Sequence, residues 1–140
     1  MKPVVNRNSP AHQAAKRFQR GVNLGNYLEG NPDDSRRANL SADEFAIMKK
    51  EGFDHVRVPI AWQHYAGSSP GFILSPEIFR RVDFVVTNAL ANRLAVILEV
   101  HHFEAFTSDP EGRTLEFLAL WLQIGAHYAE APDSVAFDLL

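Results

Sequence analysis

The residues best suited to chemistry are an arginine and two histidines, which lie in or directly after apolar runs. Arg57 lies in a Val-Arg-Val-Pro sequence, and Glu99, His101 and His102 close a run of aliphatic residues. A guanidinium among branched aliphatic side chains needs an anion or several carbonyl oxygens, because an unpaired buried charge is strongly unfavourable. One interpretation has Arg57 orient a catalytic carboxylate. The other has it point outward and pair with an acid on a helix.

The adjacent histidines raise the question of a metal site. Neighbouring side chains on a strand point to opposite faces, so His101 and His102 are poorly placed to chelate one ion, whereas Glu99 and His101 share a face. The sequence has no HxH pair, no HExxH helix and no cysteine. We therefore expect no metal and no cofactor. A metal-dependent hydrolase that uses Glu99 and His101 remains an alternative.

Aromatic side chains accompany these polar residues. Trp62 and Tyr65 follow the apolar run that contains Arg57, and Phe103 and Phe106 follow the histidines. Aromatic rings beside polar groups suit a sugar, whose C–H groups pack on a ring face while its hydroxyls reach amide, carboxylate and imidazole groups. The histidines can equally be hydrogen-bonded structural groups, and Trp62 can equally cover the rim of a barrel.

Strands and helices alternate along the chain from residue 20. Apolar, β-branched runs predict strands at residues 21–25, 54–60, 94–100 and 135–140. Three helices are predicted between them: one opened by a capping box at Ser41 and ended at Gly52, one that begins at Ser75, and one over residues 114–130 with Leu118, Trp121 and Leu122 on its apolar side. This order predicts parallel strand pairing with right-handed crossovers.

Two folds begin in this way, a doubly wound sheet and an eight-stranded (β/α)8 barrel. The first strand is not followed by the GxGxxG phosphate-binding sequence, which removes the main support for a dinucleotide fold. Polar residues instead gather at the C-terminal ends of the predicted strands, where barrel enzymes build their sites. They are Asn23, Asn26, Glu29, Arg57, Trp62, His101 and His102. We therefore predict an α/β fold of the parallel (β/α)8 TIM-barrel type, of which about four strands and three helices are present.

Composition is that of an ordinary globular domain, with 46% hydrophobic residues, 22% charged residues and a net charge of −3. The negative charge gives no support for a nucleic-acid partner or an anionic membrane surface. No apolar run approaches the roughly 18 residues of a membrane span. Residues 1–19 form a polar lead-in without a visible signal peptide, and residues 20–140 form the domain.

Four segments resemble, in order, the N-terminal half of the catalytic domain of glycoside hydrolase family 5, the cellulase-type barrels of clan A. They are Arg20–Glu29, Gly52–Trp62, Val96–His102 and Asp133–Leu140. The resemblance implies retaining cleavage of β-linked glucans or mannans by two glutamates, and an extracellular or periplasmic location. It also implies supporting active-site roles for Arg57 and His101, and sugar contacts for Asn26, Glu29, Trp62 and His102.

The same resemblance implies that both catalytic glutamates are missing. In the family the acid/base follows strand four in an Asn-Glu-Pro sequence, which would come directly after Leu140, and the nucleophile ends strand seven. We expect these 140 residues to be an inactive fragment. Because its strand edges are unpaired and its apolar inner strand faces uncovered, we expect it either to aggregate or to self-associate as a pair of half-barrels. The alternative is a non-catalytic half-barrel that binds carbohydrate or pairs with another chain.

Overall fold

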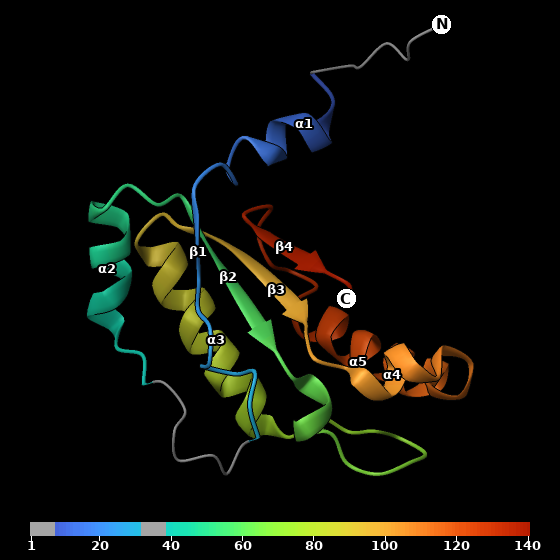
Figure 1. Ribbon diagram of the computed structural model, residues 1–140. Helices are drawn as coiled ribbons and strands as arrows, with labels where there is room; N and C mark the ends of the chain where they lie inside the picture. The colour runs from blue at the N-terminus through green and yellow to red at the C-terminus, as the bar shows by residue number, and fades with distance from the viewer. Residues whose placement is uncertain (1–7, 32–38) are drawn as a thin grey trace, which may run out of the picture.

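The computed structural model describes residues 8–31 and 39–140, so the start of the polar lead-in and part of the loop after Glu29 lie outside it. Within these residues the chain forms one parallel sheet in the order β1-β2-β3-β4 (Figure 1). The strands are β1 (Gly21–Asn23), β2 (His55–Ile60), β3 (Ala95–Val100) and β4 (Val135–Asp138). Each strand pairs with the next one along the chain, as in a (β/α)8 barrel, and the predicted fold class is confirmed.

Helix α1 (Pro10–Ala15) precedes β1, and the remaining helices connect the strands. They are α2 (Ala42–Lys50), the 3₁₀ helix η1 (Trp62–Tyr65), α3 (Pro76–Ala91), α4 (Glu104–Ser108) and α5 (Pro110–His127). The α2 helix begins where the Glu44 carboxylate accepts the Ser41 backbone N–H at 2.6 Å. It is followed by Gly52 at φ 86°, a left-handed conformation that favours glycine. The longest helix, α5, begins at Pro110 rather than at Thr114. Asp109 caps this end and accepts the Gly112 N–H at 3.0 Å.

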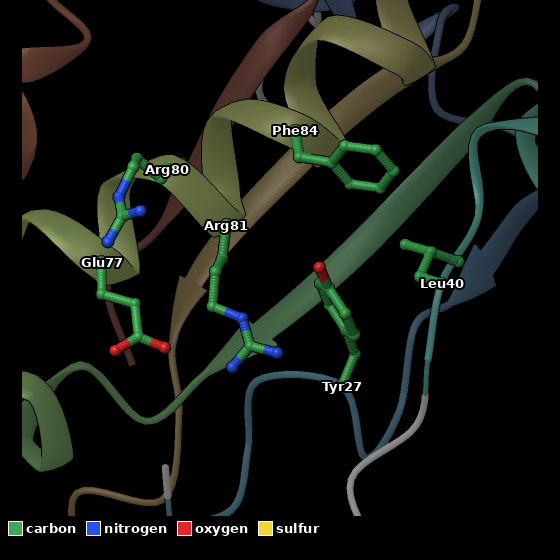
Figure 2. Close-up of a pocket in the computed structure, with 6 residues that line it drawn as sticks. All are labelled: Tyr27, Leu40, Glu77, Arg80, Arg81 and Phe84. Carbon is green, nitrogen blue, oxygen red and sulfur yellow. The ribbon is translucent and has the colours of Figure 1, made fainter.

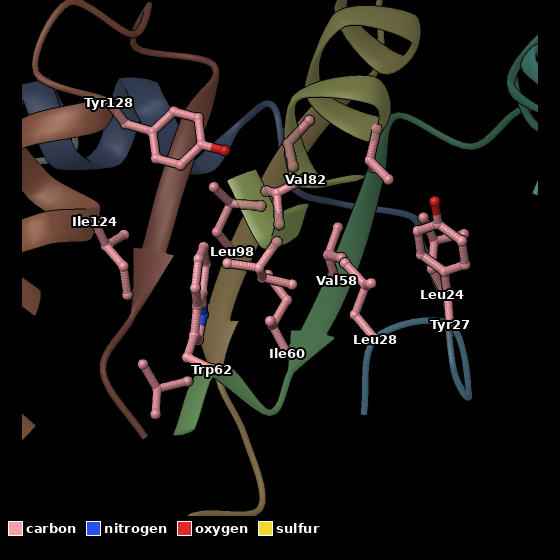
Figure 3. Close-up of a cluster of buried hydrophobic side chains, with 14 of the residues drawn as sticks. Leu24, Tyr27, Leu28, Val58, Ile60, Trp62, Val82, Leu98, Ile124 and Tyr128 are labelled. Carbon is pink, nitrogen blue, oxygen red and sulfur yellow. The ribbon is translucent and has the colours of Figure 1, made fainter. Parts of the chain in front are cut away.

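The core lies between the sheet and helices α3 and α5. Figure 3 shows Val82 of α3 and Ile124 of α5 directed toward Val58 and Leu98 of the strands. Alternate residues of β2 and β3 point to this side and are almost completely buried: Val56, Val58, Ile60, Val96, Leu98 and Val100. Burial of these branched side chains is the main force that holds the strands in place.

The opposite face of the sheet would line the inside of a barrel, and it carries polar and apolar residues together. The strand register places Asn23 beside Arg57, and Glu99 beside Asp138, whereas Ile97 lies beside Arg57 and Pro59 beside Glu99. The expectation of apolar inner strand faces therefore holds only in part, because polar residues occupy several of these alternate positions. Large exposed apolar side chains gather elsewhere, on α5 and at the chain end: Leu115, Leu118, Leu122, Phe137, Leu139 and Leu140.

The side of α5 that faces the core differs in part from the side that the sequence predicts, because Trp121 packs against the core but its two predicted neighbours do not. Leu118 and Leu122 are 50% and 74% exposed, whereas Leu120 and Ile124 are fully buried. Apolar residues surround this helix, so periodicity alone does not choose the side that packs on the sheet. No helix within residues 8–31 and 39–140 is both long and apolar enough to cross a membrane.

Candidate active site

Arg57 and Glu99 form the centre of the polar face. In the β2–β3 register Glu99 lies opposite Pro59, so Arg57 and Glu99 are diagonal neighbours on the side of the sheet away from the helices. Arg57 Nη2 forms an ion pair with Glu99 Oε2, and Arg57 Nη1 donates to Asn23 Oδ1 at 2.6 Å. The Glu99 side chain is only 7% exposed. The interpretation in which Arg57 points outward to a helix acid is therefore wrong.

His101 extends this pair toward the loop after β1. Its Nδ1 lies 3.1 Å from Glu99 Oε1, and its Nε2 lies 3.7 Å from Glu29 Oε1. The other oxygen of Glu29 accepts the backbone N–H of Asn26, which adopts a left-handed φ of 61°. A continuous polar network thus connects β1, β2, β3 and the loop after β1 at the C-terminal ends of the strands.

His102 does not point away from His101. Strand β3 ends at Val100, and His102 takes a left-handed φ of 57°. This turn brings the two imidazole centroids to 4.1 Å, and Gln63 Nε2 donates to the His102 carbonyl at 2.7 Å. The alternation argument that separated the two rings is therefore wrong, because it holds only inside a strand. The His102 side chain is 54% exposed, and its ion-pair partner Glu104 is 75% exposed.

Trp62 is buried beneath the site instead of lining it. Its ring is 1% exposed and packs 5.8 Å from Phe79, centroid to centroid. Its Nε1 donates to the Glu99 carbonyl at 3.1 Å. This placement opposes the expectation that Trp62 stacks on a sugar and fits the alternative, a tryptophan that covers the barrel end and supports β3.

A hollow of about 400 Å³ opens beside the histidines. Phe103 lines it, whereas Phe106 stacks on Phe117 with centroids 4.4 Å apart. Its other lining residues are Glu99, Val100, His101, His102, Glu104, Thr107, Ser108 and Leu140. The hollow therefore adjoins both histidines and has Phe103 as an aromatic wall.

A second hollow, of about 450 Å³, contains none of the predicted site residues. Figure 2 shows it between α3 and the segment around Tyr27, with the Arg81 guanidinium directed toward the tyrosine ring. The guanidinium carbon is 5.4 Å from the ring centroid, a cation–π contact that occupies both groups.

Asn23 and Glu99 belong to the network, although the sequence assigns neither of them a role at the site. Asn23 holds Arg57 from β1, and Glu99 joins Arg57 to His101. A usable signal was present, because Glu99 is a carboxylate inside an otherwise aliphatic strand. Among the residues that the structure describes, Glu99 is the one polar or charged residue that is buried. Such a group needs a partner, and the nearest strand supplies Arg57.

Comparisons with known proteins identify the family. Residues 18–140 match the family model of cellulases, glycosyl hydrolase family 5. Endoglucanase B of Clostridium cellulovorans is 24% identical, and the match covers 96% of this chain and 32% of the relative. The cellulase/esterase CelE of Acetivibrio thermocellus is 29% identical over 96% of this chain and 17% of the relative. The chain thus spans a third or less of the length of these two relatives.

Solved structures of Cel5A from Thermotoga maritima are similar in fold and sequence. The structure in complex with mannotriose has a TM-score of 0.84 and 38% identity, covering 89% of this chain and 41% of that one. A second, in complex with cellobiose, has a TM-score of 0.85 with the same identity and coverage. With its parallel strand order and polar network, the chain belongs to glycosyl hydrolase family 5, the cellulases, over residues 18–140.

Proposed function

We propose that this chain supplies the substrate-positioning half of a retaining glycosidase site for β-linked polysaccharide. The observation that carries the proposal is the network from Arg57 through Glu99 and His101 to Glu29, at the C-terminal ends of parallel strands. The similar Cel5A structures hold cellobiose and mannotriose, which are both β-linked sugars. Polysaccharide breakdown by endoglucanase-type cleavage is the process that this family membership favours.

Each residue of the network has a distinct proposed task. Arg57 holds positive charge, and Arg57 and His101 offer polar contacts, at the place where a catalytic carboxylate and the sugar at the cleaved bond would meet. Glu29 and the side chains of Asn26 and His102 offer groups that bind sugar hydroxyls. Glu99 orients Arg57 and His101 from below, because both of its oxygens already have partners.

We also propose that the 140 residues alone do not hydrolyse a glycosidic bond. Retention requires an acid/base and a nucleophile roughly 5–5.5 Å apart on either side of the bond. Glu99 is buried and ion-paired to Arg57, and Glu104 is 75% exposed on a short helix. Neither carboxyl group is placed for either role, and the sequence contains no Asn-Glu-Pro segment.

A titration and an activity assay on the purified chain test these two claims. We expect cellotriose to bind in isothermal titration and maltotriose, its α-linked counterpart, to bind far more weakly. We expect no release of the aryl group from an aryl β-cellobioside above the buffer rate. Equal binding of both sugars would overturn the positioning role, and sustained turnover would overturn the proposed inactivity.

We also propose that the chain self-associates, as the alternative of a non-catalytic half-barrel that pairs with another chain would require. The unpaired edges of β1 and β4 and the apolar stripe Leu115, Leu118 and Leu122 on α5 are surfaces that a neighbouring barrel segment would cover. A second copy of the chain can cover the same surfaces. Pairing of this kind leaves the polar network intact, so it is compatible with carbohydrate binding.

A further inference from the structure

We propose that Glu29, His101 and His102 form a binding site for a divalent transition-metal ion of the Zn²⁺ type. One ligand atom from each residue lies within 4.8 Å of the other two. The site uses two imidazole nitrogens and one carboxylate oxygen, a donor set that zinc accepts while it keeps its fourth position for water. Hard ions such as Mg²⁺ and Ca²⁺ prefer oxygen ligands alone, so they fit this set poorly.

His101 Nε2 and Glu29 Oε1 face each other across 3.7 Å. An ionised Glu99 carboxylate can only accept, so the His101 tautomer that bonds to it has its proton on Nδ1, 3.1 Å from Glu99 Oε1. In this neutral tautomer Nε2 is an acceptor, and a cation placed between Nε2 and the Glu29 oxygen can be bound by both. At this distance, two ligands with bonds of about 2.1 Å surround a tetrahedral ion with little adjustment.

His101 already has the support that metal-bound histidines have. Such histidines almost always donate their other ring N–H to a carboxylate or a carbonyl, which fixes the ring orientation and the tautomer. Glu99 provides this contact, and its own side chain is only 7% exposed and is held by Arg57. The imidazole is therefore oriented with Nε2 toward Glu29 before any ion arrives.

His102 is the most exposed of the three residues, so its side chain can adjust to complete the site. The three ligand atoms lie within 4.8 Å of one another, compared with a roughly 3.4 Å edge for a tetrahedral site with zinc-like bond lengths. The His102 ring is 54% exposed and pairs across 3.4 Å with the exposed Glu104, a contact of little energetic weight. Rotation of this side chain is therefore inexpensive, and its ring already lies 4.1 Å from that of His101, centroid to centroid.

The inference does not rest on the proposed glycosidase role, because the three residues and their support belong to this chain alone. Zn²⁺ is therefore tested without any sugar. Isothermal titration of the purified chain with ZnCl₂ should give one ion per chain. His102→Ala and Glu29→Gln should each weaken binding by at least about tenfold, the lower limit seen when the surroundings of a metal ligand are disturbed.

Two controls locate the ion. His64→Ala removes an exposed histidine of η1, and His127→Ala removes the histidine that pairs with Asp83, so neither should change Zn²⁺ affinity. Because a variant can lose affinity by unfolding, Co²⁺ is also added to the unmodified chain, where it should broaden the ring signals of His101 and His102 selectively in NMR spectra. The proposal is overturned if the chain binds no Zn²⁺, if His102→Ala and Glu29→Gln bind as tightly as the original, or if Co²⁺ broadens other histidines instead.

Discussion

Replacing Arg57 by methionine should destabilise the fold strongly, because it removes the charge that compensates a buried carboxylate. Glu99 would keep one partner, His101, and Asn23 would lose the 2.6 Å bond from the guanidinium. Removing one partner of a fully buried pair costs about 3–5 kcal/mol. The Arg57 side chain is 34% exposed, so water replaces part of the interaction. We therefore expect a loss of about 2–3 kcal/mol in the free energy of unfolding.

A double-mutant cycle with Glu99→Gln isolates the pair. The double variant should lose less free energy of unfolding than the two single variants lose together, by at least about 1 kcal/mol, because it leaves no uncompensated carboxylate. Urea denaturation followed by far-ultraviolet circular dichroism, at one fixed protein concentration, supplies the energies. The matched control is Arg17→Met, which breaks an exposed pair with Asp133 and should cost no more than about 1 kcal/mol. Additive single effects, or a loss for Arg57→Met no larger than that control, would refute the reasoning.

Three further predictions concern pH and assembly. Burial works to raise the pKa of Asp54, but hydrogen bonds from His55 and the backbone N–H groups of residues 19 and 20 hold it below its ordinary value. The ionised Asp54 carboxylate therefore stabilises the fold above about pH 4, and this stabilisation is lost as the pH falls further. Asp54→Asn should reduce the fall of the urea unfolding midpoint with decreasing pH, and an unchanged pH dependence of that midpoint would contradict the prediction. Burial and the Asp83 carboxylate raise the pKa of Tyr128 well above its ordinary value, so stability should fall above about pH 10, and Tyr128→Phe should reduce that fall. In sedimentation velocity the chain should sediment as a species larger than a monomer. Leu122→Lys should shift the distribution toward monomer, whereas the control Ile47→Lys, at an exposed position on α2, should not. A monomer at every concentration would exclude self-association.

The strands were predictable because their physical cause is local. Branched aliphatic residues at alternate positions of 54–60 and 94–100 must be buried, and the structure places β2 and β3 within these runs. The order of strands and helices then predicted parallel pairing and the barrel class. The short elements η1 and α4 were not predicted. They are single turns with too few residues for a periodic pattern.

The site was only partly predictable because its contacts depend on quantities that are not local. Arg57 was expected to need an anion, but the choice of Glu99 depends on the register that sets Pro59 opposite it. The position of the His102 ring depends on one left-handed residue just beyond β3. Trp62 comes directly after a strand, which is the position of a residue on the barrel rim. Its burial depends on packing against Phe79, which the sequence does not reveal.

An NMR titration of the histidine ring signals with cellobiose tests the central claim most directly. That claim is that a β-linked sugar binds at the network of Glu29, His101 and Glu99. The account predicts that the ring signals of His101 and His102 move together and saturate, while those of His64 and His127 stay fixed. Signals that remain unchanged at high cellobiose concentration, or that shift equally for all histidines, would contradict it.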